Sequence, residues 1–255
     1  MIFLLGGRGL VGSAFARLCE ASGTPYTIVD RENYGSLVGQ SCELFVNANG
    51  NSRKPLAVRE PLTDFDANVR VTRQTLVDFR FDRYLHLSSC DVYPDCATPA
   101  VTGEEQVLDP AAQSPYGFHK GLGEACVRHA ARDWLIFRLG GFVGPGLKKN
   151  AIFDILHGGP LWLDPASALQ FLHTDDAARI MLDLARRGPS REIFNLCGAG
   201  VVSLEQVMAD AGREVPVNPG SPRVQYEVSI AKISRLVEVP PTRKTVAAFI
   251  AGYTK

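Results

Sequence analysis

The sequence MIFLLGGRGLVG (residues 1–12) places a short apolar run directly before a glycine-rich turn. Beyond the turn, Val11, Ala14 and Leu18 recur at helical spacing, so this segment predicts a strand, a tight turn and a helix. Glycines at 6, 9 and 12 let the backbone turn sharply and approach a pyrophosphate, which the free N–H groups of a helix N-terminus can bind. Such a turn is a weak signal alone, but its place between the first strand and a helix predicts a dinucleotide site.

Asp30 ends the second expected strand, residues 26–30. It stands about 20 residues after the glycines, where a dinucleotide fold places the acid that binds the ribose. The alternative is an aspartate that caps a loop, and the spacing favours the ribose. The chain from Asp30 to the next strand, residues 43–47, has room for one short helix only, so one strand and its helix are expected to be missing. Asn47 and Asn49 end that strand with small polar groups suited to a cofactor ribose or phosphate.

Three residues are candidates for one catalytic set. Ser89 follows the apolar run 84–87, and Tyr116 and Lys120 stand four residues apart after Pro115, which can open a helix. One positive charge at ~4 Å in an effective dielectric of ~20 supplies on the order of 4 kcal/mol. That is roughly the amount needed to lower a tyrosine pKa from about 10 to ~7. We therefore expect Lys120 to lower the pKa of Tyr116; the alternative is a surface pair on a helix beside an ordinary strand end.

The bulk composition is that of an ordinary globular protein, with 255 residues, 45% hydrophobic and 21% charged. Lys+Arg and Asp+Glu both number 27, so no nucleic-acid or membrane surface is expected. The apolar start is too short for a signal peptide or a membrane span, which predicts a cytoplasmic protein. The six cysteines form no C-x-x-C pair, so we expect reduced thiols and no metal site.

Local signals also mark elements nearer the C-terminus. Thr174 is expected to cap a helix, Ser203 and Gln206 suggest a capping box, and short helices are expected near 229–236 and 242–251.

Five motifs in order give the chain a family resemblance. They are the turn Gly6-x-x-Gly9-x-x-Gly12, the stretch Ser89-Cys90-Asp91-Val92-Tyr93, Pro115-Tyr116-x-x-x-Lys120, and the segments 138–146 and 171–176. Together they resemble the extended short-chain dehydrogenase/reductases, specifically the NAD-dependent epimerase/dehydratase group, whose fourth-helix asparagine matches Asn68. The chain departs from that pattern at Gly141, where the family often has asparagine, and at Gln170, where it has arginine. Cys90 replaces the acid of the family's dehydratases, which makes dehydration the less expected reaction.

The resemblance implies an α/β fold, a Rossmann-type doubly wound parallel sheet with a small C-terminal substrate lobe. Residues 1–146 with 169–197 would form the dinucleotide-binding domain, and residues 147–168 with 198–255 the lobe. The expected activity is that of an NAD(P)-dependent epimerase or reductase, acting on a secondary alcohol or ketone of a nucleotide-activated sugar. The alternatives are an oxidoreductase on a small carbonyl or alcohol without a nucleotide, and a non-catalytic NAD(P)-binding regulator. A homodimer through the helices around 65–79 and 116–131 is also implied.

These implications assign roles to specific residues. Ser89, Tyr116 and Lys120 are the catalytic candidates. The cofactor candidates are Gly6, Arg8, Gly9, Leu10, Val11, Gly12, Asp30, Arg31, Asn47, Asn49 and Lys120. The substrate candidates are Asp91, Gly141, Lys148, Lys149, Asn150 and Arg223. NAD is expected over NADP because a carboxylate at Asp30 repels a 2′-phosphate, although Arg8 and Arg31 favour the phosphate. Lys148 and Lys149 suit a diphosphate, and the alternative is a solvated surface pair.

Overall fold

The computed structural model describes residues 1–253. Its strands are β1 (Ile2–Leu5), β2 (Tyr26–Val29), β3 (Ser41–Asn47), β4 (Arg80–Ser89), β5 (Trp134–Leu139), β6 (Gly141–Val143), β7 (Ala168–Leu169), β8 (Phe171–His173), β9 (Glu192–Leu196) and β10 (Val202–Ser203). Its α-helices are α1 (Gly12–Ser22), α2 (Tyr34–Leu37), α3 (Lys54–Arg59), α4 (Pro61–Phe65), α5 (Val71–Asp78), α6 (Pro115–Ala130), α7 (Ala151–His157), α8 (Thr174–Arg187), α9 (Leu204–Ala211) and α10 (Thr242–Tyr253). A π-helical turn, Asp66–Arg70 (η1), joins α4 to α5, and the 3-10 turns are Cys90–Val92, Pro99–Val101, Pro110–Ala112 and Ile233–Arg235.

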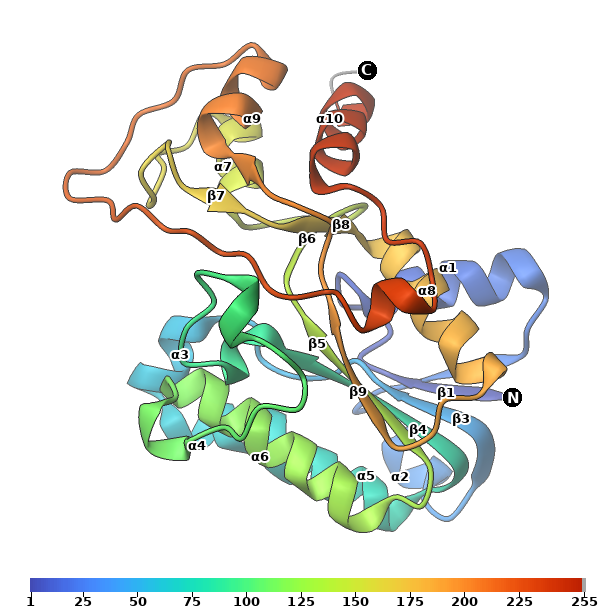
Figure 1. Ribbon diagram of the computed structural model, residues 1–255. Helices are drawn as coiled ribbons and strands as arrows, with labels where there is room; N and C mark the ends of the chain where they lie inside the picture. Colours follow the sequence, from blue (N-terminus) through green and yellow to red (C-terminus); the bar gives the residue numbers. More distant parts are fainter. Residues whose placement is uncertain (254–255) are drawn as a thin grey trace. The chain divides into compact units, whose positions relative to one another are not determined.

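A parallel sheet of six strands in the order β2-β1-β3-β4-β5-β9 organises the first part of the chain (Figure 1). β1 lies between β2 and β3, with Ile2 opposite both Tyr26 and Leu44. The four-residue helix α2 is the only helix between β2 and β3 in the described chain. The expected loss of one strand and its helix is therefore confirmed, and β2 becomes the edge of the sheet.

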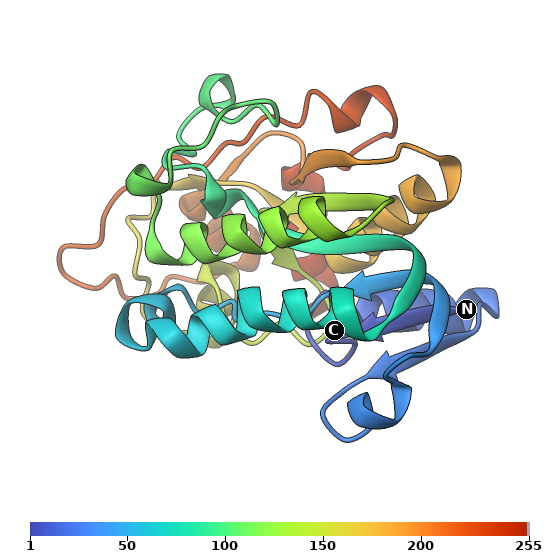
Figure 2. The same cartoon turned by 90° about the horizontal axis from the view of Figure 1, so that it is seen from below.

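Helices cover both faces of this sheet, which confirms the doubly wound architecture. α5 and α6 lie side by side on one face (Figures 1 and 2), and α1 and α8 lie on the other. The side chain of Arg186 near the end of α8 donates to Thr24, just beyond α1, at 3.3 Å.

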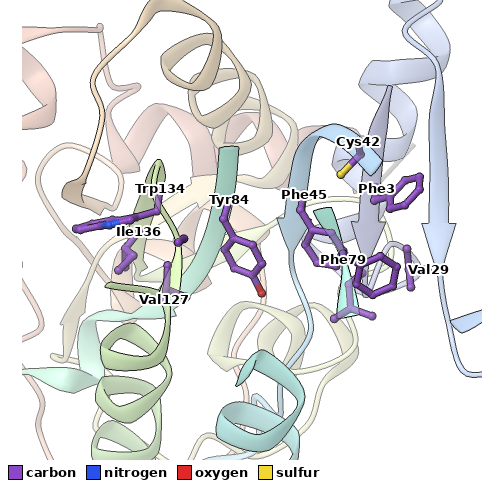
Figure 3. Packing of buried hydrophobic residues seen from close by; sticks show 11 residues of the cluster. Phe3, Val29, Cys42, Phe45, Phe79, Tyr84, Val127, Trp134 and Ile136 are labelled. Atoms are coloured by element: carbon purple, nitrogen blue, oxygen red, sulfur yellow. The ribbon is translucent and has the colours of Figure 1, made fainter. Parts of the chain in front are cut away.

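The core under α5 and α6 is an aromatic layer across the sheet. Figure 3 shows Phe3, Phe45, Tyr84 and Trp134 along it, with Phe79 entering from the end of α5. The rings of Phe45 and Tyr84 are stacked with centroids 5.2 Å apart. Each large side chain buried here contributes about 1.5–3 kcal/mol of hydrophobic stabilisation, so the layer fixes the sheet that carries the candidate site.

Two compact units divide the chain. The first contains residues 1–94, 107–139 and 177–194, and the second contains 95–106, 140–176 and 195–255. The division drawn from the sequence differs, because it gave 95–106, 140–146, 169–176 and 195–197 to the dinucleotide-binding domain. The assignment of a substrate lobe stays a prediction. Within the second unit, β6 pairs with β8 and β7 pairs with β10.

Two local expectations need correction, and the helix expected near 242–251 is confirmed as α10. Residues 229–236 form only the 3-10 turn Ile233–Arg235 rather than a helix. Thr174 is the first residue of α8, and its buried hydroxyl has no hydrogen-bond partner among the described residues; the preceding His173 accepts from the Asp175 N–H at 3.2 Å instead. Ser203 caps α9, because its hydroxyl accepts from the Gln206 N–H, but the Gln206 side chain donates to Asp210, so only this half of the expected capping box is found.

No helix within residues 1–253 combines the length and the apolar character that crossing a membrane would require.

Candidate active site

The glycine-rich turn forms a close-packed cradle between β1 and α1. Gly6 has φ +77°, and a Cβ there would lie 2.7 Å from the Ala48 carbonyl oxygen after β3. A Cβ on Gly12 would collide with the Gly6 carbonyl, so only glycine allows α1 to begin so close to the turn. Val11 precedes α1 without a side-chain cap, and no acidic residue stands in its first turn. The first N–H groups of α1 and its positive dipole end therefore suit an anion such as a pyrophosphate.

Asp30 follows β2, where the sequence placed it, and performs two tasks in this structure. Its Oδ1 accepts from the Glu32 and Asn33 N–H groups, at 3.0 and 3.3 Å, which is the loop-capping alternative. Its Oδ2 lies 2.9 Å from a guanidinium nitrogen of Arg8, whose side chain is 73% exposed. The cofactor candidates Arg8 and Asp30 are thus brought together at the end of β2, while Arg31 is exposed in the same turn.

Asn47 and Asn49 end β3, but their side chains bond within the fold. The buried Asn47 amide donates to Thr72 and to the Tyr84 hydroxyl, and its carbonyl oxygen accepts from the Asn49 N–H at 3.1 Å. The Asn49 amide donates to the Ala67 carbonyl at 3.1 Å. This geometry favours a role in shaping the turn after β3, and a direct cofactor contact by either side chain stays a prediction.

Ser89 and Tyr116 meet where β4 ends and α6 begins. Pro115 is the first residue of α6, as the sequence predicted, and the Ser114 hydroxyl caps the helix. A Cβ on Gly117 would collide with the Asp91 carbonyl, so the first turn of α6 packs directly on the turn after Ser89. Tyr116 is buried at this contact, and its hydroxyl shares a hydrogen bond with Ser89. Ser89 also donates to Asp91 Oδ2 at 3.0 Å.

The pKa of Tyr116 is shifted in the direction opposite to the one expected. Burial raises this pKa most, and the charge of Asp91 raises it further; the Ser89 hydrogen bond lowers it, and Asp64 adds a smaller rise. The sequence argument considered only the ammonium of Lys120. It could not include the desolvation of the phenolate, which opposes ionisation of any buried tyrosine.

Lys120 is buried one turn after Tyr116, and its ammonium donates to the Leu87 carbonyl oxygen at 2.8 Å. Burial lowers the pKa of this lysine to about 8, although the charges of Glu124, Asp64 and Asp91 oppose the shift. His86 on β4 lies beneath α6, and burial followed by the charge of Lys120 lowers its pKa well below the ordinary value. The ammonium therefore stands among a neutral imidazole and three carboxylates.

Two further ion pairs border the site, and sequence reasoning missed both as site features. The Lys54 ammonium lies 2.7 Å from Asp91 Oδ1. Arg138 on β5 forms two hydrogen bonds to Glu124, at 3.0 and 2.9 Å, and both side chains are buried. Glu124 also acts on the charge of Lys120, which stands four residues before it on α6. This spacing could have marked Glu124 as a neighbour of the candidate site.

A buried polar cluster around Asp64, packed against α6, was also missed. Asp64 in α4 has no exposed surface and accepts hydrogen bonds from Asn51 at 2.7 Å, from Asn68 at 3.0 Å and from His119 at 2.7 Å. Asn68 Oδ1 is buried and has no hydrogen-bond partner among the described residues. His119 lies directly before Lys120 in sequence, which is the one signal that pointed toward this cluster.

The remaining substrate candidates lie in the second unit, where the fold explains two of the departures from the family pattern. A Cβ on Gly141 would lie 2.6 Å from the Gln170 carbonyl oxygen, because β6 packs closely on β8. The buried Gln170 side chain donates to Gly198 and Val228 carbonyls and accepts from the Val228 N–H. These residues therefore have packing roles of their own.

Asn150 has φ +140°, and its side chain is used inside the second unit. Its Oδ1 accepts from the Phe153 N–H and its Nδ2 donates to the Phe142 carbonyl, both at 2.9 Å. Lys148 and Lys149 are exposed in the preceding loop, and Arg223 is exposed in the extended segment after α9. A diphosphate site at these cations stays a prediction. Among residues 1–253 no cluster of three or more His, Cys, Asp or Glu residues could hold a metal ion.

The fold matches solved structures along nearly the whole chain. MoeE5 in complex with UDP-glucuronic acid and NAD superposes with a TM-score of 0.82 at 17% identity, covering 99% of this chain and 98% of the other. RMD from Pseudomonas aeruginosa complexed with NADPH gives a TM-score of 0.78 at 20% identity, covering 100% of both chains. A UDP-glucuronic acid 4-epimerase variant from Bacillus cereus, in complex with UDP-4-deoxy-4-fluoro-glucuronic acid and NAD, gives 0.78 at 17% identity, covering 99% and 98%.

Sequence comparison assigns the family. A search of curated proteins gave no match. The sequence model of the NAD dependent epimerase/dehydratase family matches residues 2–197, which carry the glycine cradle, Ser89, Tyr116 and Lys120. The chain therefore belongs to the NAD-dependent epimerase/dehydratase family of enzymes.

Proposed function

We propose that this enzyme interconverts a secondary alcohol and a ketone on a nucleotide-activated sugar, as an epimerase or a reductase, with Tyr116 as the general acid/base. The supporting observation is the hydrogen bond that Ser89 shares with Tyr116 where β4 ends and α6 begins, with the Lys120 ammonium bonded to Leu87 on the same strand. A buried tyrosine hydroxyl that shares a hydrogen bond with a serine can exchange a proton with a third oxygen held between them. A protein that only binds a dinucleotide has no need of this arrangement.

In this proposal, residues of the chain accept the substrate's hydroxyl proton during oxidation and donate a proton during reduction. When bound, the nicotinamide cofactor accepts the hydride, with its electron pair, from the carbinol carbon, or returns it to the ketone. In oxidation the substrate hydroxyl gives its proton to the Tyr116 phenolate as the carbonyl forms. In reduction the neutral Tyr116 gives its proton to the developing alkoxide, and its raised pKa favours this neutral form. Ser89 orients the reacting oxygen, and the Lys120 ammonium stabilises the phenolate.

For the cofactor we propose NAD over NADP. The cradle of Gly6, Gly9 and Gly12 and the uncapped start of α1 suit the pyrophosphate, and Asp30 after β2 suits the ribose hydroxyls. Arg8 already lies against Asp30 and compensates its charge, which reduces the repulsion of a 2′-phosphate. We therefore expect a moderate preference, measurable as the ratio of the Kd values for NADH and NADPH in a titration.

For the substrate we propose a sugar carried by a nucleoside diphosphate. Two solved structures of the same fold hold UDP-linked sugars. In this chain Lys148, Lys149 and Arg223 would bind the diphosphate, with Asp91 and Gly141 nearer the sugar. Replacing Lys148 and Lys149 by alanine should then raise the KM roughly 10-fold or more, because charge-assisted hydrogen bonds contribute about 1.5–3 kcal/mol each. The Kd for NAD should not change. An unchanged KM would favour a substrate without a nucleotide.

We also propose that the enzyme is a homodimer. An apolar groove of about 400 Å³ lies between the α4–α5 segment and α6. Its lining residues are Phe65, Val69, Arg73, Leu122, Ala125, Cys126 and His129. The same helices pair between copies in the resembling family, so a second copy is the proposed occupant. The cytoplasmic location expected from the sequence stays a prediction.

The catalytic proposal is tested by Tyr116→Phe. Substrates are first found by screening UDP-linked sugars for thermal stabilisation of the protein in the presence of NAD. The variant should lose about 10²–10⁴ in turnover and keep its cofactor affinity. Tyr34→Phe is the matched control, because the Tyr34 hydroxyl donates to Asp78 away from the site, at 2.9 Å. A Tyr116→Phe enzyme that keeps most of its activity would refute the assignment.

A further inference from the structure

The buried carboxylate of Asp64 has no role in the catalytic scheme above, yet three side chains form hydrogen bonds with it. It has no exposed surface, and two side-chain amides and one imidazole donate to it. Burying an ionised carboxylate is unfavourable unless charge compensation accompanies the hydrogen bonds. His119 supplies such compensation only when it is protonated.

The charges around Lys120 show which group is left to compensate Asp64. The carboxylates that act on the Lys120 ammonium are Glu124, Asp64 and Asp91. Glu124 is neutralised by Arg138 through two hydrogen bonds, and Asp91 is neutralised by Lys54 at 2.7 Å. Asp64 is the one carboxylate of the three whose partners in the described chain include no permanent cation.

The immediate neighbours of the Lys120 ammonium also leave its charge uncompensated. Its only described hydrogen bond is to the neutral Leu87 carbonyl, and the neighbouring imidazole of His86 is neutral. The position that a Cβ on Gly50 would take lies 2.6 Å from Asn68 Oδ1 and 3.4 Å from Lys120 Nζ. The Asn68 side chain, whose amide donates to Asp64, therefore lies near the Lys120 ammonium beside Gly50.

We propose that Asp64 is the counter-ion of Lys120, and that His119, Asn51 and Asn68 hold it in place as a positioning residue for the catalytic helix. This inference rests on the proposed role of Lys120 and deepens it. Tyr116, His119 and Lys120 share one face of α6, so the hydrogen bond from His119 to Asp64 also fixes the angle at which α6 presents its catalytic side chains. Asp64 touches neither substrate nor cofactor in this scheme and acts through Lys120.

The test is a direct titration of Lys120 in the cofactor-free protein. The chain has seven lysines, so carbon-13 at their ε positions gives few NMR signals, and Lys120→Met identifies the one of interest. Asp64→Asn should move the titration midpoint of Lys120 to lower pH by about one unit, because an opposite charge within a few ångströms shifts a pKa by roughly 1–3 units. The high-pH loss of turnover should move in the same direction.

Two variants separate charge from structure. Asp66→Asn removes a carboxylate from the same segment, but one that is exposed and paired with Arg70, so the Lys120 midpoint should not move. His119→Asn places an amide nitrogen near the position of the imidazole Nδ1 and should keep the wild-type midpoint. A midpoint in Asp64→Asn that equals that of Asp66→Asn would overturn the proposal. This readout needs no substrate, so it can succeed or fail independently of the Tyr116 mechanism.

If Asp64→Asn does not fold, Lys120→Met carries the test. Without the ammonium, a buried carboxylate is left without charge compensation, so the folded variant should bind more protons than folded wild type as the pH falls from 7 to 5. Proton uptake by the folded state means that the stability of Lys120→Met relative to wild type rises over this range. A relative stability that stays constant from pH 7 to pH 5 would contradict the counter-ion role.

Discussion

Lys120→Met should make the first unit more stable at neutral pH, although it removes a member of the proposed catalytic set. Burial lowers the pKa of Lys120 to about 8 from an ordinary value of 10.5. Keeping this group charged at pH 7 therefore costs the folded state about 3 kcal/mol, at 1.36 kcal/mol per pH unit. Methionine has a similar length and no charge to desolvate. The variant also loses the hydrogen bond to the Leu87 carbonyl, which offsets about 1 kcal/mol, so we expect a net gain of about 2 kcal/mol.

The pH dependence of this gain has a definite sign. The folded-state pKa lies below the unfolded one, so between about pH 8 and 10.5 the unfolded chain binds more protons than the folded chain at this group. The stability of the wild type, relative to the variant, must rise with pH in that window. The part of this advantage that comes from the charge of Lys120 itself is therefore complete below pH 8 and disappears as the pH approaches 10.5; any further rise below pH 7 would come from the protons that the folded variant takes up when the ammonium is absent.

Tryptophan fluorescence during urea unfolding measures the free energy of unfolding of the first unit, in wild type and in Lys120→Met. Trp134 is buried in the first unit, whereas Trp162 lies in the second and is 70% exposed, so a Trp162→Phe background isolates the first. Lys244→Met, at an exposed position on α10, is the control and should show no such trend. A Lys120→Met protein that is less stable than wild type at pH 7, with no change up to pH 10, would refute the claim that Lys120 is held charged at a cost.

Three further outcomes are expected. Asp30→Asn should weaken NADH binding more than NADPH binding in a fluorescence titration, because it removes an acceptor for the ribose hydroxyls and releases Arg8; equal losses would count against Asp30 as the discriminating residue. Glu124→Gln should lower the free energy of unfolding by about 3–5 kcal/mol, since it leaves the buried Arg138 guanidinium unpaired, and a urea midpoint near that of wild type would contradict this. Light scattering at micromolar concentration should give the mass of a dimer, and Val69→Glu in the apolar groove should give a monomer that still unfolds cooperatively.

The elements around the site could be predicted from the sequence because their signals are local. Gly12 is required by its contact with the Gly6 carbonyl inside the turn, and Pro115 restricts the backbone where α6 starts. The absence of one strand followed from counting the residues between Asp30 and β3. In each case the determining contacts lie close in sequence, or the residue type itself restricts the backbone.

The roles of individual polar residues could not be predicted in the same way. Asn47 is fixed by Tyr84, and Asp91 by Lys54, each of them 37 positions away in sequence. The contact between Asp64 and His119 joins residues 55 positions apart. Gly141 and Gln170 stood out as departures from the family pattern, but close approach of β6 to β8 explains Gly141, and hydrogen bonds to Gly198 and Val228 explain Gln170. Long-range pairing of this kind depends on the strand order, which residue spacing does not encode.

The charges beneath α6 connect these observations with the chemistry. A buried tyrosine whose pKa is raised is a poor base unless a positive charge stands near it, and a buried lysine stays positive only if the fold supplies negative charge. Too much negative charge would disfavour ionisation of Tyr116, since Asp91 and Asp64 both raise its pKa. The fold pairs Asp91 with Lys54 and Glu124 with Arg138, and neither pair includes Asp64. The positive charge that an oxidised nicotinamide would supply near Tyr116 would favour the phenolate, so we expect ionisation of the proposed base to follow cofactor binding rather than precede it.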